Sequence, residues 1–205
     1  MSFQIKKETE TKENLCIMKV LEDIPGGVLL MASSLKSGTE EIGAGTIIGE
    51  DSGNAGQYHI VKTAKLQANA TNSATDYRVL KGHQFKVADI ISTKDVASCK
   101  AYAITSITET ETAYDTLTVG TTLGVTMTAA NGIVLVQVAA VDSSGGVSVP
   151  KYTPKAVTRD TVEVDESLNN IWVGAIVRGT FNESLLPFYV NTDLKDRLGA
   201  RFLFL

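Results

Sequence analysis

The sequence predicts a mainly β protein, a barrel- or sandwich-like domain of short antiparallel strands with one short C-terminal helix. Its apolar runs are short, rich in residues that favour strands, and separated by turns that contain Gly, Asn or Pro. From Leu117 to Met127 apolar residues alternate with Thr or Gly, which is the period of a strand with one buried face. Residues 192–199 combine helical spacing with helix-end signals.

Residues 1–22 differ from the rest of the chain and predict an N-terminal arm. Charges of both signs lie between Lys6 and Glu13, and an apolar patch follows from Leu15 to Leu21. Chain termini are ordered only when something ties them down. The same residues are therefore either an arm that pairs with a neighbouring subunit or a first strand with a frayed end.

A series of short strands is expected after the arm. The turn Ile24-Pro-Gly-Gly27 introduces the first, because Pro fixes φ and Gly accepts positive φ. The clearest element is a β-hairpin, in which the strand from Leu117 turns at Asn131-Gly132 and returns as 133–138. The other expected strands lie at residues 28–32, 42–48, 58–66, 77–80, 85–87 and within 97–107.

The Ser- and Gly-rich connection 142–150 is the best candidate for a domain boundary. We therefore expect an arm over 1–22, a β-rich domain over 23–145, and a C-terminal β segment over 146–205 that packs on the same domain. Within this last segment, strands are expected at 155–164 and 171–178.

The predicted helix follows these strands. Thr192 is the expected N-cap and Gly199 the expected end, while Leu194 and Leu198 lie four residues apart on one buried face. The apolar tail 201–205 then has to be buried, either in the chain's own core or against a partner.

Composition argues against several classes of function. The 205 residues carry a net charge of −4 and give no sign of the basic face that nucleic-acid binding requires. No apolar run reaches the roughly 20 residues that span a bilayer, and the first residues lack the apolar region of a secretory signal. We expect no nucleic-acid partner, no membrane, and assembly in the cytoplasm. Cys16 and Cys99 are then expected as small buried side chains rather than a disulfide or a reactive thiol.

Residue types that catalysis needs are sparse. The two histidines, His59 and His83, have no Ser, Cys or carboxylate at a spacing typical of a catalytic site. Neither they nor the cysteines form a metal-binding pair. The glycines of 43–49 do not match a phosphate-binding loop. The sequence therefore predicts neither an enzyme nor a cofactor or metal site.

One segment resembles a known family. The stretch Arg178-Gly-Thr-Phe-Asn-Glu-Ser-Leu-Leu-Pro187, followed by the short helix and the apolar tail, resembles accessory capsid proteins of tailed bacteriophages. These are head decoration, auxiliary capsid and head-fibre proteins, including those of crAss-like phages that infect Bacteroidales. The turn at Ala44-Gly-Thr46 is similar to one in head decoration domains. The resemblance is most specific over 171–205 and diffuse over 25–140, and relatives are expected to carry a small residue where Phe181 stands.

The resemblance implies a structural virion protein that binds the outer surface of the expanded capsid lattice, stabilising it or anchoring a head fibre. Its implied partners are the major capsid protein and further copies of itself, with a trimer favoured. The arm and the apolar tail are the expected contacts, through Phe3, Ile5, Leu185, Leu186, Phe202 and Phe204. Two alternatives stay open: an adhesive or carbohydrate-binding β-domain of a phage tail or cell surface, and a small hydrolase.

Overall fold

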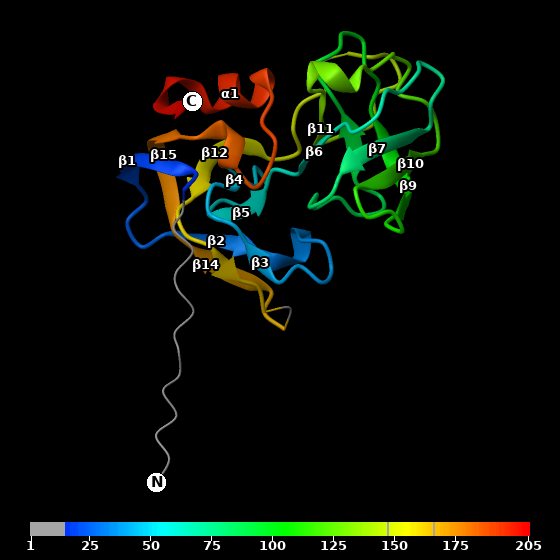
Figure 1. Cartoon of the computed structure of the whole chain (residues 1–205). Helices are drawn as coiled ribbons and strands as arrows, with labels where there is room; N and C mark the ends of the chain where they lie inside the picture. Colours follow the sequence, from blue (N-terminus) through cyan, green and yellow to red (C-terminus); the bar gives the residue numbers. More distant parts are fainter. Residues whose placement is uncertain (1–14, 147, 166) are drawn as a thin grey trace.

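The computed structural model describes residues 15–146, 148–165 and 167–205. Within these residues the chain forms sixteen short strands, one α-helix and four single-turn 3-10 helices, which confirms the predicted mainly β fold. Most strands belong to two curled sheets that lie side by side (Figure 1). We call these sheets the first and the second barrel. A two-stranded ladder of β3 (Glu41–Ile42) and β13 (Val162–Glu163) completes the strand pairing.

The first barrel is built from both ends of the chain. Its strands pair in the order β1-β15-β12-β4-β5-β2-β14, and β16 lies parallel to β15. These strands are β1 (Ile17–Asp23), β2 (Val28–Met31), β4 (Ile47–Glu50), β5 (Gln57–Ile60), β12 (Thr153–Thr158), β14 (Asn170–Val173), β15 (Ala175–Phe181) and β16 (Phe202–Phe204).

This sheet closes on itself because two pairs of strands are continuous. Strand β14 leads through Gly174 directly into β15, and β1 leads into β2 through a short turn. In that turn Gly27 has a φ of +77°, and a Cβ atom there would lie 2.4 Å from the carbonyl oxygen of Val173. Only glycine accepts both the positive φ and this close approach of two backbones. The interior holds apolar side chains that include Val28, Leu30, Ile48, Ile60, Ala156, Ile171 and Val173.

The second barrel is an insertion between β5 and β12 of the first. Its strands pair in the order β6-β11-β8-β9-β10-β7, and a bridge between Leu66 and Val79 joins the two ends of this order. Its core includes the fully buried Tyr77, Phe85 and Leu117. The strands are β6 (Thr63–Lys65), β7 (Asp76–Leu80), β8 (Ile90–Ser92), β9 (Tyr102–Thr108), β10 (Tyr114–Val119) and β11 (Val134–Gln137).

A third apolar cluster joins the two barrels and the helix α1 (Thr192–Leu198). It combines strand residues of the first barrel with Val134 and Val136 of β11, and with Leu194 and Leu198 of α1. The two barrels therefore share a packed layer. Its buried members are Ile47, Val61, Val134, Val136, Val157, Ile176, Phe181, Val190, Leu194, Leu198 and Phe202.

The predicted hairpin around Asn131-Gly132 is wrong. Strand β10 ends at Val119, and β11 pairs with β6 and β8 instead of β10. Gly132 does have a positive φ, of 69°, but it ends the 3-10 helix Ala129–Asn131. Leu123 and Met127 are fully buried from an irregular segment rather than from a strand. Their alternation therefore reflects burial in the barrel core and not strand geometry.

The C-terminal helix is confirmed, with one correction. Leu194 and Leu198 are fully buried, and Gly199 is the C-cap as predicted. The N-cap is Asn191, whose Oδ1 accepts a hydrogen bond from the backbone amide of Leu194 at 3.1 Å. The expected cap, Thr192, is instead the first helical residue. Asn191 has extended dihedral angles, which allow its side chain to reach that amide.

Part of the expected arm forms a strand. Residues 17–22 belong to β1, which pairs antiparallel with β15, and residues 1–14 lie outside the described residues. The expected domains 23–145 and 146–205 contribute neighbouring strands to the first barrel. Cys16 and Cys99 are buried and free, as expected, and Cys16 Sγ donates to the carbonyl of Ala44 at 3.2 Å. In the part of the chain described above, no helix has the length and apolar character to cross a membrane.

Candidate functional site

His83 lies in a cluster that has the residue types of a metal site, in which His83 and Asp115 are buried and Glu109 is exposed. Ligand atoms of His83, Glu109 and Asp115 all lie within 4.8 Å of one another. The tautomer of His83 argues against a metal, however. Its Nδ1 accepts a hydrogen bond from the backbone amide of Phe85 at 3.2 Å, so the proton of the neutral ring is on Nε2. A metal ligand needs a lone pair on that nitrogen.

Lysines neutralise the two carboxylates of the same cluster. Lys81 forms an ion pair with Asp115, and Lys36 of the first barrel forms one with Glu109 of the second. His83 Nε2 lies 3.2 Å from Asp115. Burial is the main cause that lowers the pKa of His83 to about 4, so the ring is neutral at pH 7. The cluster is an ion-pair network that connects the barrels, and the tautomer of His83 and the lysine partners of both carboxylates disfavour a metal there.

His59 has a similarly structural setting. Its ring stacks on that of Tyr152, with centroids 4.0 Å apart and an interplanar angle of 4°. Its Nε2 lies 3.7 Å from Asp51, and burial lowers the pKa of the ring. His59 also lines a cavity of about 150 Å³ at the junction of the two barrels. The buried side chain of Lys62 lines the same cavity.

Lys62 is a lysine with only 1% of its surface exposed. It lies between β5 and β6, where the chain passes from the first barrel to the second. Its Nζ binds Oδ2 of Asp89 at 2.7 Å, and Oδ1 of the same carboxylate accepts from Nε2 of Gln137 at 2.6 Å. The backbone amide of Lys86 also donates to Asp89, at 2.8 Å. We call Lys62, Asp89 and Gln137 the junction triad.

Backbone pairing places the triad residues. In the β6–β11 ladder Val136 is opposite Thr63, and the next amide, of Gln137, donates to the carbonyl of Lys62 at 3.0 Å. The side chains of Lys62 and Gln137 are therefore cross-strand neighbours on one face. Local sequence patterns do not mark this triad as a site. Its only signal is a lysine within the apolar strand run His59–Leu66.

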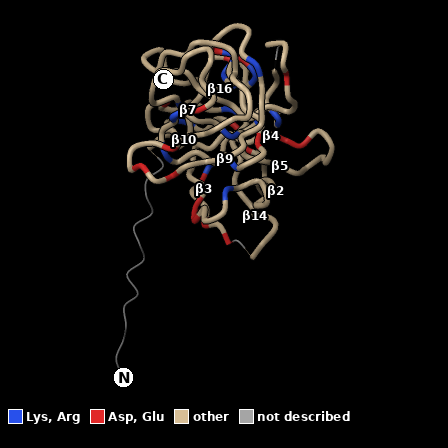
Figure 2. Tube along the Cα trace, turned by 90° about the vertical axis from the view of Figure 1, so that its right-hand side faces the viewer, with Lys and Arg blue, Asp and Glu red and all other residues tan. Residues whose placement is uncertain are grey.

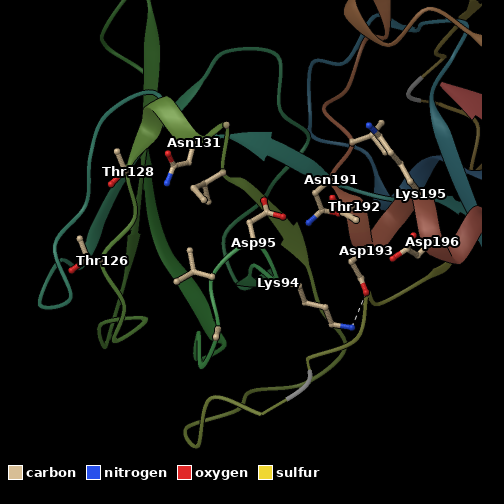
Figure 3. Close-up of a pocket in the computed structure, with 15 residues that line it drawn as sticks. Lys94, Asp95, Thr126, Thr128, Asn131, Asn191, Thr192, Asp193, Lys195 and Asp196 are labelled. Carbon is tan, nitrogen blue, oxygen red and sulfur yellow. Dashed lines mark hydrogen bonds and ion pairs between the residues drawn. The ribbon is translucent and has the colours of Figure 1, made fainter. Parts of the chain in front are cut away.

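A polar groove of about 880 Å³ separates the second barrel from the start of α1. Figure 3 shows Thr126, Thr128 and Asn131 on one wall, and Asn191, Thr192 and Asp193 on the other. Lys94 bridges the walls through an ion pair with Asp193 at 2.8 Å, drawn as a dashed line.

The charged groups that line the groove are largely engaged by the protein itself. Asp95 accepts from the amide of Val134 at 2.7 Å, and Asp193 also binds Arg197 at 2.8 Å. Asn191 Nδ2 and Ser148 Oγ have no partner among the described residues, and both line a neighbouring cavity of about 10 Å³. That volume holds one water molecule. The groove is therefore lined mainly by polar groups, unlike the predominantly apolar walls of a typical ligand pocket.

The first barrel presents apolar side chains at one edge. Among the described residues, strand β1 pairs with β15 on one side only. Its exposed residues include Met18, Val20 and Leu21, which are 58%, 41% and 52% exposed. Leu15, just before the strand, is 66% exposed. We call these four residues the apolar edge. An open strand edge with exposed apolar side chains is a surface that another protein strand can pair with.

The residues expected at an interface occupy different environments. Phe202 is buried and Phe204 half-buried, and both rings stack on Phe181. Leu186 is half-buried against the shared layer, and Leu185 is exposed. Because β16 adds to β15 as a strand, its alternation exposes Leu203 instead, together with the terminal Leu205. Phe3 and Ile5 lie outside the described residues.

Charged residues of both signs are interspersed along the chain in the view of Figure 2.

The chain matches no family model, no curated protein and no solved structure in the comparisons made with them.

Proposed function

We propose that this chain is a structural protein of a bacteriophage virion that binds the outer surface of the expanded capsid lattice. In this role it stabilises the lattice or anchors a head fibre. The resemblance of residues 171–205 to accessory capsid proteins suggests the partner. The structural observation that supports the proposal is the apolar edge of β1, which offers an open strand edge and exposed apolar side chains to another protein.

The apolar edge has the chemistry of a docking surface. Full burial of one Leu- or Met-sized side chain contributes roughly 1.5–3 kcal/mol, so a few such contacts repeated over many copies stabilise a lattice. Leu203 and Leu205 of the C-terminal tail add exposed apolar surface to the same barrel. A major capsid protein that offers a strand edge would pair with β1 by strand addition.

Binding of this kind stabilises one state of a shell by mass action. A protein that binds the expanded lattice and not the unexpanded one shifts the balance towards expansion by its difference in affinity. The two barrels suit this role because they share a packed layer and the Lys36–Glu109 ion pair, and the Lys94–Asp193 pair joins the second barrel to α1. A rigid body loses little conformational entropy on docking.

An adhesive or carbohydrate-binding role is the second candidate. Trp172 on β14 is 63% exposed, and its indole Nε1 donates to the carbonyl of Gly26, which fixes the ring on the surface. An exposed, oriented indole is a surface on which a sugar ring can stack. This role predicts few copies per particle, on a tail or fibre.

Quantitative mass spectrometry and cryo-electron microscopy of purified particles distinguish the two roles. The capsid role predicts hundreds of copies, with density on the outer lattice at symmetry-related positions. A few copies at the tail would support adhesion, and absence from particles would overturn both the capsid role and adhesion by a phage tail. Sedimentation of the purified protein tests the expected trimer.

A further inference from the structure

We propose that the junction triad forms an intramolecular isopeptide bond between Nζ of Lys62 and the side-chain carbonyl carbon of Gln137, with Asp89 as the catalytic group. The bond would join the strand that enters the second barrel to the strand that leaves it. This inference is independent of the proposed capsid role, because it rests only on side chains inside one chain.

The geometry brings a nucleophile, an acceptor and a proton carrier together. Lys62 Nζ and Gln137 Nε2 bind the two oxygens of the Asp89 carboxylate, at 2.7 and 2.6 Å. Cross-strand pairing of Lys62 with Gln137 holds both side chains on one face. Gln137 Oε1 has no hydrogen-bond partner among the described residues, so no protein donor holds the amide in its resting orientation through this oxygen.

The reaction balances without any co-reactant. Asp89 accepts a proton from the Lys62 ammonium, and the neutral amine attacks the carbonyl carbon of Gln137. Asp89 then delivers the proton to Nε2 of Gln137, which it already contacts. The attacking nitrogen still carries one proton more than a secondary amide, and Asp89 accepts this proton as the carbon–nitrogen bond to Nε2 breaks. The departing ammonia takes the proton from Asp89 and leaves as ammonium, and a secondary amide remains between the two side chains. One carboxylate that touches both nitrogens thus acts as base and then as acid.

The environment of Lys62 favours the neutral amine, which is the form of the side chain that can attack a carbonyl carbon. Its burial is the main cause that lowers the pKa of its ammonium group, and the charges of Lys86 and Lys151 act in the same direction. More of the lysine is therefore a neutral amine than it would be in water. Positioning also compensates for the poor reactivity of an amide, since effective molarities of oriented groups reach about 10⁵–10⁸ M.

The intact mass of the purified full chain, measured under denaturing conditions, tests the proposal directly. We expect a mass lower by one ammonia molecule than the sequence requires. The full mass in correctly folded protein would overturn the proposal. A deficit of one water molecule would overturn it too, because it would place the bond between Lys62 and Asp89.

Peptide mapping locates the bond. Trypsin should leave the chain uncut after Lys62, and the peptide 37–65 should appear joined to the peptide 101–151. Mapping is needed because Asn131-Gly132 can also lose ammonia by forming a succinimide. The Asn131→Ala variant is the matched control. It should keep the deficit, and loss of the deficit in this variant would overturn the assignment to Gln137.

Variants of the triad test the role of each residue. Lys62→Met and Asp89→Asn should have the full calculated mass, with no branched peptide. Lys155→Met should keep the deficit, because the side chain of Lys155 forms an ion pair with Glu50 and takes no part in the triad. A deficit that persists in Lys62→Met would overturn the proposal. The wild-type mass remains decisive if a triad variant fails to fold.

Discussion

The ring of Phe202 stacks on the ring of Phe181, with centroids 6.0 Å apart. Phe181 ends β15, and Phe202 begins β16, the last strand of the chain. The pair therefore anchors the C-terminal tail to the first barrel, in the layer that also contacts α1 and the second barrel. The resemblance to capsid proteins leads us to expect a small residue at position 181 in relatives, and in this chain Phe181 is a fully buried aromatic ring.

Replacing Phe181 with alanine should strongly destabilise the protein. Truncation of a fully buried Phe leaves a cavity and costs about 3–5 kcal/mol in the free energy of unfolding. Urea denaturation measures this loss. Trp172→Ala is the matched control, because the Trp172 side chain is 63% exposed and surface substitutions usually change stability by about 0.5 kcal/mol or less. Equal effects of the two variants would contradict the assigned packing of the tail.

The N-cap of α1 gives a second stability test. Asn191→Ala should lower the free energy of unfolding by about 1 kcal/mol, because the amide of Leu194 loses its capping acceptor. Thr192→Ala should have little effect, since Thr192 is exposed and its position is helical. The same denaturation measurement compares both variants. A larger loss of stability in Thr192→Ala than in Asn191→Ala would contradict the assignment of Asn191 as the N-cap and would support Thr192 instead.

Protonation of His83 should destabilise the fold in acid. Its pKa is about 4 in the folded protein and 6.5 when unperturbed, so the unfolded state binds the proton first as the pH falls. The part of the folding stability that depends on a neutral His83 ring is therefore fully present above pH 6.5 and is lost as the pH falls towards 4. Converted to free energy, the difference between those pKa values corresponds to about 3 kcal/mol.

Urea denaturation at pH 7 and pH 4.5 checks this expectation. The His83→Asn variant should lose much less stability than the wild type between the two pH values. His59 is present in both proteins, so the comparison isolates His83. An identical loss in both proteins would show that His83 does not titrate in this window.

The strand content and the C-terminal helix were predictable because they depend on local patterns. Leu194 and Leu198, four residues apart before Gly199, define the buried face and the end of α1 without any tertiary information. The hairpin at Asn131-Gly132 failed because the same local signal ends a 3-10 helix. Strand partners depend on contacts between residues that are distant in the chain, so local sequence patterns do not reveal them.

The polar junction was not predictable for a related reason. Lysine is almost never fully buried without a partner, so Lys62 has the appearance of a solvent-exposed strand residue in the sequence. Asp89 lies 27 positions after Lys62 in the sequence, and Gln137 lies 48 positions after Asp89. Only closure of the second barrel brings the three side chains together.

The most direct test of the proposed capsid role is co-sedimentation of the purified protein with expanded capsids that lack it. Wild-type protein should sediment with the capsids in saturable amounts. The double variant Met18→Ser with Leu21→Ser removes two side chains of the apolar edge and should bind at least about tenfold more weakly, since each 1.4 kcal/mol lost is a factor of ten. Trp172→Ser, an exposed apolar residue on β14, should bind as wild type. Undiminished binding of a correctly folded double variant would contradict the assignment of the apolar edge as the docking surface.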